Sequence, residues 1–291
     1  MSFVQQNPKI PEGINTSTDN PLKEFFILLA GVLFVLGASV ALLLLFANTL
    51  APHIPFRYEQ QLANKYGEWS KSKTESSLAL QEAEAAVQDL GQQLAAQADL
   101  GSDISVHFHL LDQANTPNAF ATLGGHIFVT TGLLKEVSSE NALAMVLAHE
   151  IAHIKFRHPA QSLSGGLLVQ LFLSIVTGGQ NATALQNTTQ QTGLLTMLGF
   201  SRQMESKADD AALTTLENHY GHLAGAEQFF SKVLAQHGQA RWQALFTSHP
   251  DLRQRINHIQ RRAQQQSGAN SGDNTAQATK PLDPRLANFG A

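Results

Sequence analysis

The segment from residue 25 to residue 52 contains no charged side chain, and this constrains the fold more than any other feature of the chain. Its core reads FFILLAGVLFVLGASVALLLLF, longer than the roughly 20 apolar residues with which a helix crosses a bilayer. It is also longer than the roughly 7 to 15 apolar residues of a cleaved signal peptide. We therefore predict one uncleaved transmembrane helix over residues 25–51, after a flexible tail over residues 1–24.

The charges that flank this segment do not fix its orientation. Lys9 and Lys23 precede it, while Arg57, Lys65 and Lys71 follow it, so the positive-inside rule favours neither direction. A short tail before the anchor and a long domain after it favour a domain outside the cytoplasm. We therefore expect a single-pass protein of a bacterial inner membrane, with the long domain on the extracytoplasmic side.

Composition restricts the functions open to the rest of the chain. The absence of cysteine excludes disulfides, thiolate metal sites, cysteine nucleophiles and a lipid-modified cysteine. The net charge is −4 and the one dense basic stretch lies at residues 253–262, so nucleic acid is not an expected partner. Any metal must therefore be held by His, Asp or Glu.

Apolar periodicity predicts an α+β domain in which helices dominate. After a juxtamembrane linker over residues 52–74, apolar side chains recur at a three-four spacing between Leu80 and Leu94, which is typical of an amphipathic helix. The repeat covers about two heptads, fewer than the three or four that indicate a coiled coil. We expect this helix to pack on the domain rather than to form a dimer.

Two segments with β-strand patterns follow. Residues 104–110 alternate apolar and polar side chains, which predicts a strand with one buried face. His107 and His109 share its wetter face, where we interpret them as solvated rather than as a metal pair. In NAFATLGGHIFVTTGLL, Gly124 and Gly125 separate two apolar, β-branched runs, so a hairpin or a bent strand pair is expected. The domain should therefore contain a small β-sheet.

The chain then has a helical pattern to about residue 265, and one folded domain is expected over residues 75–265. One alternative for residues 163–177 is a second membrane span. This stretch is short and contains Gln170 and Ser174, so we favour a buried helix or a membrane-touching lip. Residues 266–291 are rich in Gln, Ser, Asn, Gly and Pro and are predicted to be disordered.

The sequence HEIAH at residues 149–153 is the strongest indication of function. A serine before Glu140 can cap a helix that continues through this motif without Gly or Pro. With about 3.6 residues per turn, His149 and His153 lie on one side of that helix and can reach one ion. Apolar residues surround them, so the helix should be buried, and buried imidazoles and the Glu150 carboxylate need a partner. A metal ion supplies one.

A catalytic zinc ion usually has three protein ligands and one open position. A third histidine soon after HEIAH is excluded, because Phe156 and Pro159 stand where that pattern needs Gly and His. A carboxylate from a later helix is the other known arrangement, and SRQMESKADDAAL offers Glu205 with Asp209 one turn further on. We predict Glu205 as the third ligand and Asp209 as hydrogen-bond acceptor for a ligand histidine.

Two other interpretations of this region are open. His219 and His222 are rival third ligands, although Gly221 between them should interrupt a helix. The two carboxylates can also belong to an ordinary solvated helix face, with Arg202 and Lys207 as ion-pair partners. The HEIAH motif favours the metal site over both.

Three motifs in this order, HEIAHIKFRH, SRQMESKADDAA and SHPDLRQRI, resemble the M48 family of zinc peptidases, from about residue 75 to residue 262. The resemblance implies a zincin-type fold of the gluzincin class with one zinc ion per chain. It also implies that His149, His153 and Glu205 are the zinc ligands, with Glu150 as general base and Asp209 in support. Some family members carry several membrane spans, whereas this chain is closer in layout to those with a soluble catalytic domain.

The resemblance also implies roles for residues outside the ligand set. His249, in SHP, is similar to a family histidine near the cleft; it can stabilise an oxyanion, occupy the fourth zinc position in a latent state, or cap the following helix. His158 lies five residues past His153, so we expect it to point away from the ligands and to be structural. The strand beside the cleft pairs with an extended substrate in such enzymes. The candidate docking residues are Ile127, Phe128, Val129 and Thr130.

These features predict a zinc-dependent endopeptidase whose partners are a protein or peptide substrate and the bilayer. We expect the substrates to be unfolded or damaged proteins of the membrane or envelope. One alternative is a membrane-anchored, zinc-binding chaperone or scaffold with little or latent proteolysis, which the intact Glu150 disfavours. Another is a membrane adaptor in which HEIAH is accidental, which zinc stoichiometry would test.

Overall fold

The computed structural model describes residues 20–50, 53–66, 77–163, 200–236, 240–249, 252–269, 278–287 and 289. The chain separates into two compact units, Met1–Leu43 and Leu44–Ala291. Most of the apolar stretch over residues 163–177 lies outside the described residues. The structure therefore does not distinguish between a second membrane span and a buried helix for this stretch.

Helix α1 (Pro21–Leu50) contains the apolar segment. It begins at Pro21 rather than at residue 25, because the Asn20 side chain accepts a hydrogen bond from the backbone N–H of Leu22 (3.1 Å) and proline fits the first turn of a helix. The part from Pro21 to Leu42 is long and apolar enough to cross a membrane, and none of it is buried.

A three-stranded sheet with the order β1-β3-β2 lies in the larger unit. Strand β2 (Ala119–Ala121) is antiparallel to β3 (His126–Thr130), and the turn η3 (Leu123–Gly125) joins them, which confirms the predicted hairpin. Strand β1 (His107–Leu111) pairs with β3 in parallel. β3 is therefore the central strand, and β1 and β2 are its two neighbours.

Two glycines make the turn between β2 and β3. Gly124 and Gly125 have φ angles of 73° and 84°, in the left-handed region that residues with a Cβ avoid. A Cβ atom at Gly125 would also lie 1.9 Å from the carbonyl oxygen of Ser105. Glycine is therefore required here both for the backbone conformation of the turn and for the close contact between Gly125 and the segment that precedes β1.

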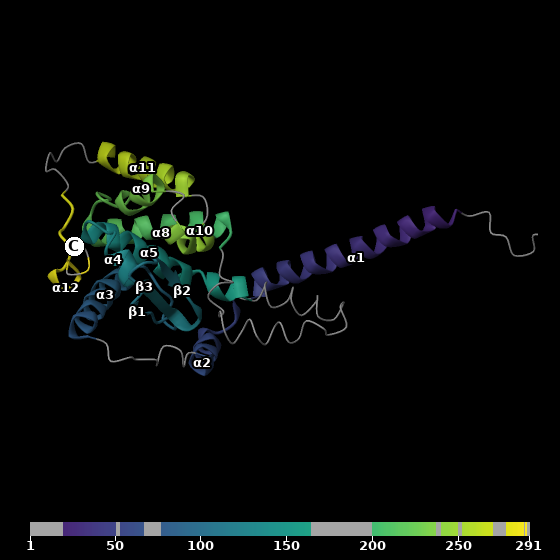
Figure 1. The fold of residues 1–291 in the computed structure, drawn as a ribbon, viewed down its shortest axis with the longest axis horizontal. Helices are drawn as coiled ribbons and strands as arrows, with labels where there is room; N and C mark the ends of the chain where they lie inside the picture. Colours follow the sequence, from purple (N-terminus) through teal and green to yellow (C-terminus); the bar gives the residue numbers. More distant parts are fainter. Residues whose placement is uncertain are drawn as a thin grey trace, which may run out of the picture. The chain divides into compact units, whose positions relative to one another are not determined.

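One face of the sheet packs against helices α3 (Leu78–Gln97) and α5 (Glu140–Lys155), as Figure 1 shows. The Ser77 side chain caps α3, and its buried residues include Val87, Leu90 and Leu94, so this predicted amphipathic helix packs on the domain as expected. The side chains that line this face of the sheet are Phe108, Leu110, Ala119, Ala121, Ile127 and Val129, and all are buried.

Helix α5 lies at the centre of the core. Ser139 caps it by accepting a hydrogen bond from the N–H of Ala142 (3.2 Å), and the helix is buried from Asn141 to Ile154. Helix α8 (Arg202–Tyr220) packs along α5, begins after the cap Ser201 and ends at Gly221. The helix that contains HEIAH is therefore buried, as the apolar residues around the motif predicted.

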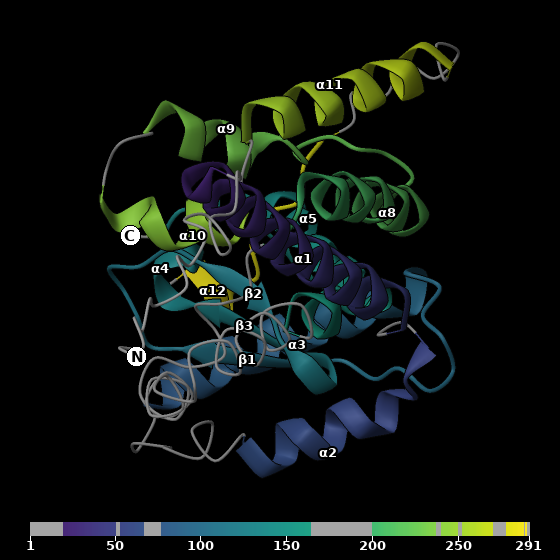
Figure 2. The same ribbon diagram turned by 90° about the vertical axis from the view of Figure 1, so that its right-hand side faces the viewer.

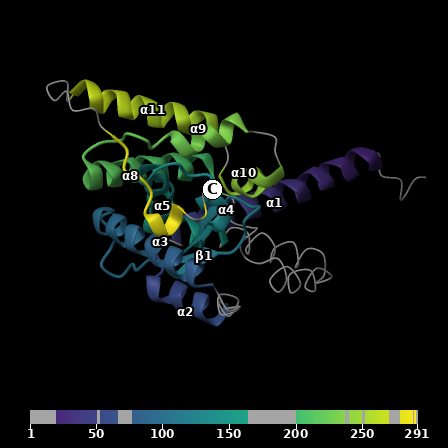
Figure 3. The same ribbon diagram turned by 60° about the vertical axis from the view of Figure 1, so that its left-hand side comes forward.

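The other described helices pack around this core, and among them the short α4 is itself buried. In Figures 2 and 3, α9 and α11 lie beyond α8 on one side, and α2 lies on the opposite side. They are α2 (Phe56–Tyr66), α4 (Thr131–Leu134), α9 (Gln228–Ala235), the 3-10 turn η4 (Ala240–Trp242), α10 (Gln243–Ser248), α11 (Leu252–Ala269) and α12 (Pro284–Ala287). Helices dominate and the sheet is small, which confirms the predicted fold class.

The end of the chain differs from the disordered tail expected over residues 266–291. Helix α11 continues to Ala269, and residues 278–287 lie against the core. The N–H of Lys280 donates to the side-chain oxygen of Asn141 (2.8 Å), and the carbonyl of Lys280 accepts from the N–H of Glu140 (3.0 Å). Leu286 is buried in the hydrophobic core. A few apolar contacts and two backbone hydrogen bonds therefore hold a segment whose composition alone indicated disorder.

Candidate metal centre

The two histidines of HEIAH point from the middle of α5 to the same place. Their Nε2 atoms lie 2.9 Å apart, and both residues are buried. Because His149 and His153 are separated by about one helical turn, the rigid helix presents both rings on one side. They can bind one ion together, as the sequence predicted.

Helix α8 adds a carboxylate to this pair. Oε1 of Glu205 lies 3.4 Å from Nε2 of His153, and its Oε2 lies 3.5 Å from Nε2 of His149. Burial by itself would raise the pKa of Glu205, but His249 and hydrogen bonds from both helix histidines lower it far below its usual range. Glu205 is 2% exposed, so the alternative of a solvated helix face is wrong.

His249 completes the group. It follows α10, and its Nδ1 lies 3.2 Å from both carboxylate oxygens of Glu205. The potential ligand atoms of His149, His153, Glu205 and His249 all lie within 4.8 Å of one another. Within the described part of the chain, no other set of three or more such side chains gathers in this way.

Unsatisfied polar atoms next to the group support a metal ion there. Glu150 is 2% exposed, and among the described residues neither its Oε2 nor Nε2 of His249 has a hydrogen-bond partner. Buried polar atoms without partners are rare in folded proteins. Two imidazoles and a carboxylate form a donor set that zinc accepts. The residues present therefore fit a divalent metal ion.

Asp209 orients one of the ligands. Its Oδ1 lies 2.9 Å from Nδ1 of His149, and Nε2 of that ring faces the group. Arg255 of α11 donates to both oxygens of Asp209, at 2.8 and 2.7 Å, and its Nη1 lies 3.1 Å from Glu205. Burial by itself would raise the pKa of Asp209, but Arg255 and His149 lower it below its usual range. Asp209 therefore remains ionised beside His149.

Sequence reasoning missed Arg255 and Phe200. It assigned Arg255 only to a basic stretch, although the residue belongs to SHPDLRQRI, the same motif as His249. The ring of Phe200 stacks on His153 with 3.9 Å between ring centroids, and Phe200 is buried. No sequence pattern indicated this contact. All four members of the ligand group are buried as well.

The expectation for His158 is wrong, because its Nδ1 lies 2.8 Å from Nδ1 of His153. Helix α5 ends at Lys155 instead of continuing to His158, and a positive φ of 60° at Arg157 turns the chain back. Burial, together with the nearby Lys207, lowers the pKa of His158 to about 4. His158 is thus a neutral ring that contacts a ligand histidine.

Other histidines considered from the sequence lie outside the group. His219 is in the last turn of α8 and His222 follows Gly221, and neither gathers with the ligands. On β1, His107 is exposed, and His109 is half-buried with its Nε2 2.9 Å from Nδ1 of His126. No metal-type cluster includes these residues in the described chain.

The strand predicted to dock substrate has no free edge. Residues 127–130 belong to β3, which pairs with β1 on one side and β2 on the other, and Ile127, Phe128, Val129 and Thr130 are all buried. A peptide cannot add to a strand whose two edges are already paired. The docking prediction for these residues is therefore wrong, and β2 is the edge strand on the other side of the hairpin.

Comparisons with known proteins agree with this centre. Peptidase family M48 matches residues 81–263. The chain is 32% identical over 161 residues to the mitochondrial metalloendopeptidase OMA1 of Schizosaccharomyces pombe, covering 55% of this chain and 47% of that protein. It is 28% identical over 190 residues to a putative beta-barrel assembly-enhancing protease of Vibrio cholerae, covering 62% of this chain and 39% of that protein. The matches thus span less than half of either relative.

Proposed function

Because the chain belongs to peptidase family M48, we propose that it is a zinc-dependent endopeptidase that hydrolyses peptide bonds of proteins. The observation that carries this proposal is the buried group of His149, His153 and Glu205, with the Glu150 carboxylate beside it, whose Oε1 lies 3.4 Å from His249 and whose Oε2 has no hydrogen-bond partner among the described residues. In this proposal His149, His153 and Glu205 hold one zinc ion per chain. When bound, zinc supplies a Lewis acid that polarises the scissile carbonyl and lowers the pKa of a water molecule.

Glu150 serves as the general base. It takes a proton from the attacking water and delivers it to the amine that leaves when the peptide bond breaks. Its Oε2 is buried without a hydrogen-bond partner among the described residues, so it is free to accept that proton. Asp209 and Arg255 hold His149 and Glu205 in position.

His249 has two proposed roles, oxyanion donor or fourth zinc ligand in a latent state. The latent role is favoured by its 3.2 Å contacts with Glu205 and by the burial of the whole group. Cleavage by a His249→Ala variant separates the two, because the rate rises if His249 blocks the site and falls if it stabilises the oxyanion. An unchanged rate with zinc retained would remove both roles.

A substrate chain can add to the sheet only at an edge strand, β1 or β2, and we favour β2 because it packs against α5, the helix that carries His149 and His153. The side chains of Ala119 and Ala121 are buried on the core face of the sheet, so a peptide added here pairs with the backbone edge of β2. As substrates we propose unfolded or damaged proteins of the membrane or envelope, because α1 anchors the domain at a bilayer and one relative is named for beta-barrel assembly. The location proposed is a bacterial inner membrane, with the domain on the extracytoplasmic side.

The test is cleavage of casein by the zinc-loaded full chain in detergent, comparing wild type with Glu150→Gln. Loss of the base should lower the rate on the order of a hundredfold to ten-thousandfold while zinc content stays the same. Glu82→Gln, which changes an exposed glutamate on α3, should cleave like wild type. Equal cleavage by the Glu150 variant would contradict the proposal. If neither protein cleaves although both bind zinc, the chaperone or scaffold alternative is favoured.

A further inference from the structure

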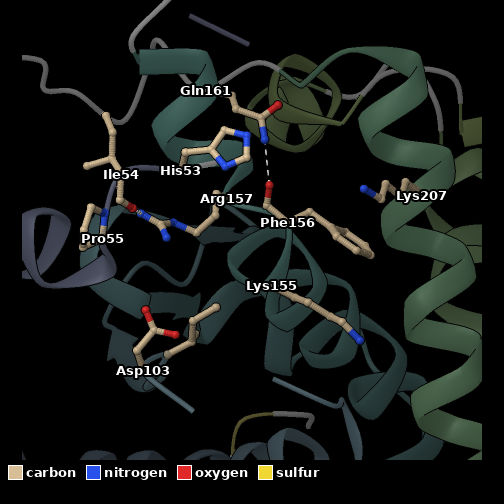
Figure 4. Close-up of a pocket in the computed structure, with 10 residues that line it drawn as sticks. His53, Ile54, Pro55, Asp103, Lys155, Phe156, Arg157, Gln161 and Lys207 are labelled. Atoms are coloured by element: carbon tan, nitrogen blue, oxygen red, sulfur yellow. Dashed lines mark hydrogen bonds between the residues drawn. The ribbon is translucent and has the colours of Figure 1, made fainter. Parts of the chain in front are cut away.

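A pocket lies at the end of α5, outside the ligand group of the metal centre. It has a volume of about 430 Å³. Its walls come from residues 53–55, which follow α1, from the turn after α5, from α8, and from the segment before β1 (Figure 4). No member of the ligand group lines it. The proposed peptidase function therefore leaves this pocket unexplained.

The lining is rich in cations. Lys155, Arg157 and Lys207 face it together with His53, against the single carboxylate of Asp103. Lys155 is partly engaged, because its Nζ donates to the carbonyl of Ala98 (2.7 Å) and lies 3.6 Å from Asp99. The pocket thus carries more positive than negative charge, and an anion is the favoured ligand.

Lys207 is the cation best placed to bind one. It is exposed, its Nζ lies 4.0 Å from the centre of the Phe156 ring, and among the described residues it makes no hydrogen bond or ion pair. In Figure 4 it points from α8 toward the side of the pocket that carries Gln161 and His53, while Asp103 lies at the opposite side. An anion near Lys207 is therefore distant from the one opposing charge.

A fixed arginine forms part of the wall. Arg157 is 7% exposed, and it donates to Glu59 through Nε (2.7 Å) and to the carbonyl of Ile54 through Nη2 (2.8 Å). These bonds hold residues 53–55 against the end of α5. Its Nη1 has no partner within the described ranges. A buried guanidinium with a fixed orientation therefore forms part of the pocket wall. The pocket is not merely a gap between surface side chains.

The pocket is also close to the proposed membrane anchor along the chain. Helix α1 ends at Leu50, and three residues span at most about 11 Å, so His53 lies within that distance of the end of the helix. The phosphates of a bilayer lie just outside its apolar core. If α1 spans the membrane, as proposed above, a short stretch of chain connects the membrane surface to the residues that line this pocket.

We propose that this pocket binds a phosphate group, which a phospholipid headgroup at the membrane surface or free phosphate can supply. Lys207 contributes a mobile ammonium donor, and Arg157, whose charge is paired with Glu59, contributes a fixed guanidinium to the wall. The side chain of Gln161 lies on the same side of the pocket and donates from Nε2 to the carbonyl of Phe156 (2.7 Å). No chemical step is involved, and the site acts by binding alone.

The test measures binding by calorimetry to the full chain in a nonionic detergent, after a chelator has removed metal so that phosphate cannot bind at the metal centre. The probes are inorganic phosphate and dihexanoyl phosphatidylglycerol. Lys207→Gln should weaken binding of at least one probe roughly tenfold, because a charge-assisted hydrogen bond is lost. Lys135→Gln, which removes the same charge from an exposed position outside the pocket, should bind like wild type.

The two probes distinguish the sources. Tighter, Lys207-dependent binding of the lipid identifies a headgroup site, and equal binding of inorganic phosphate identifies a free-phosphate site. Equal losses in Lys207→Gln and Lys135→Gln, or the absence of saturable binding for both probes, would overturn the proposal. Glu150→Gln should bind both probes like wild type, so failure of this proposal and failure of the proposed peptidase activity are separate results.

Discussion

Arg255 brings a positive charge into a buried part of the metal centre. It donates to both oxygens of Asp209 and lies 3.1 Å from Glu205, although it is only 5% exposed. Two carboxylates buried this close together destabilise the fold unless a cation compensates them. Its guanidinium also lies 4.6 Å from the centre of the Phe230 ring. We infer that Arg255 keeps both carboxylates ionised and oriented for metal binding.

Replacing Arg255 with Gln should lower the free energy of unfolding by about 3–5 kcal/mol, because both carboxylates stay buried without their cation. Arg255→Lys should recover only part of this loss, since an ammonium cannot form the paired bonds of a guanidinium. Urea unfolding of the metal-free full chain in detergent, followed by fluorescence of the buried Trp242, measures the change. Arg253→Gln, at an exposed position on the same helix, is the control. Equal effects of Arg253→Gln and Arg255→Gln would contradict the role of Arg255.

The sequence predicted the part of the centre that one helix determines. The spacing of HEIAH places His149 and His153 on one side of α5, whatever surrounds the helix. Arg255 and His158 escaped prediction because their contacts depend on how α11 packs against α8 and on where α5 ends. Such contacts between distant segments leave no local periodic pattern in the sequence.

Among the elements, helix α1 is the one whose exposed apolar side chains need an apolar environment. Leu28 and Phe34 on this helix are 70% and 76% exposed. Apolar surface in water is unfavourable by roughly 25 cal/mol for each Å², so a helix of this length exposed in water would promote aggregation. A bilayer removes this cost, and for that reason we propose that α1 is a membrane anchor.

The anchor proposal predicts that the full chain stays with bacterial membranes after an alkaline carbonate wash. A variant with both Leu28→Arg and Phe34→Arg should be washed off, because each charge at the centre of a span disfavours insertion by about 2.5–3.5 kcal/mol. Protease added to spheroplasts should digest the domain if it lies outside the cytoplasm. Release of the unmodified chain by carbonate would contradict the anchor, and a protected domain would contradict the proposed side.

The strands show where prediction from local sequence stops. The hairpin of β2 and β3 was predictable, because Gly124 and Gly125 mark its turn. The parallel pairing of β1 with β3 was not, since it joins segments with β2 between them along the chain. This pairing makes β3 central and so removes it as a docking edge. The contact of Lys280 with Asn141 escaped prediction for the same reason, as it joins residues 139 positions apart in the sequence.

In the molecule as a whole, the metal centre exists only when the domain is folded. Its ligands come from α5, from α8 and from the residue that follows α10, so the unfolded chain has no comparable site. A metal ion that binds the folded form alone stabilises that form. Metal binding, stability and activity should therefore depend on the same residues.

The most direct test of this account is a zinc titration of the full chain after its metal has been removed with a chelator, with casein cleavage as the readout. We predict no cleavage without metal, and activity that rises with added zinc and saturates at one zinc ion per chain. Glu205→Gln should need far more zinc or fail to recover, because a charged ligand is lost. Cleavage that persists in the metal-free chain, or recovery in Glu205→Gln at the same zinc concentration as wild type, would contradict a zinc centre formed by His149, His153 and Glu205.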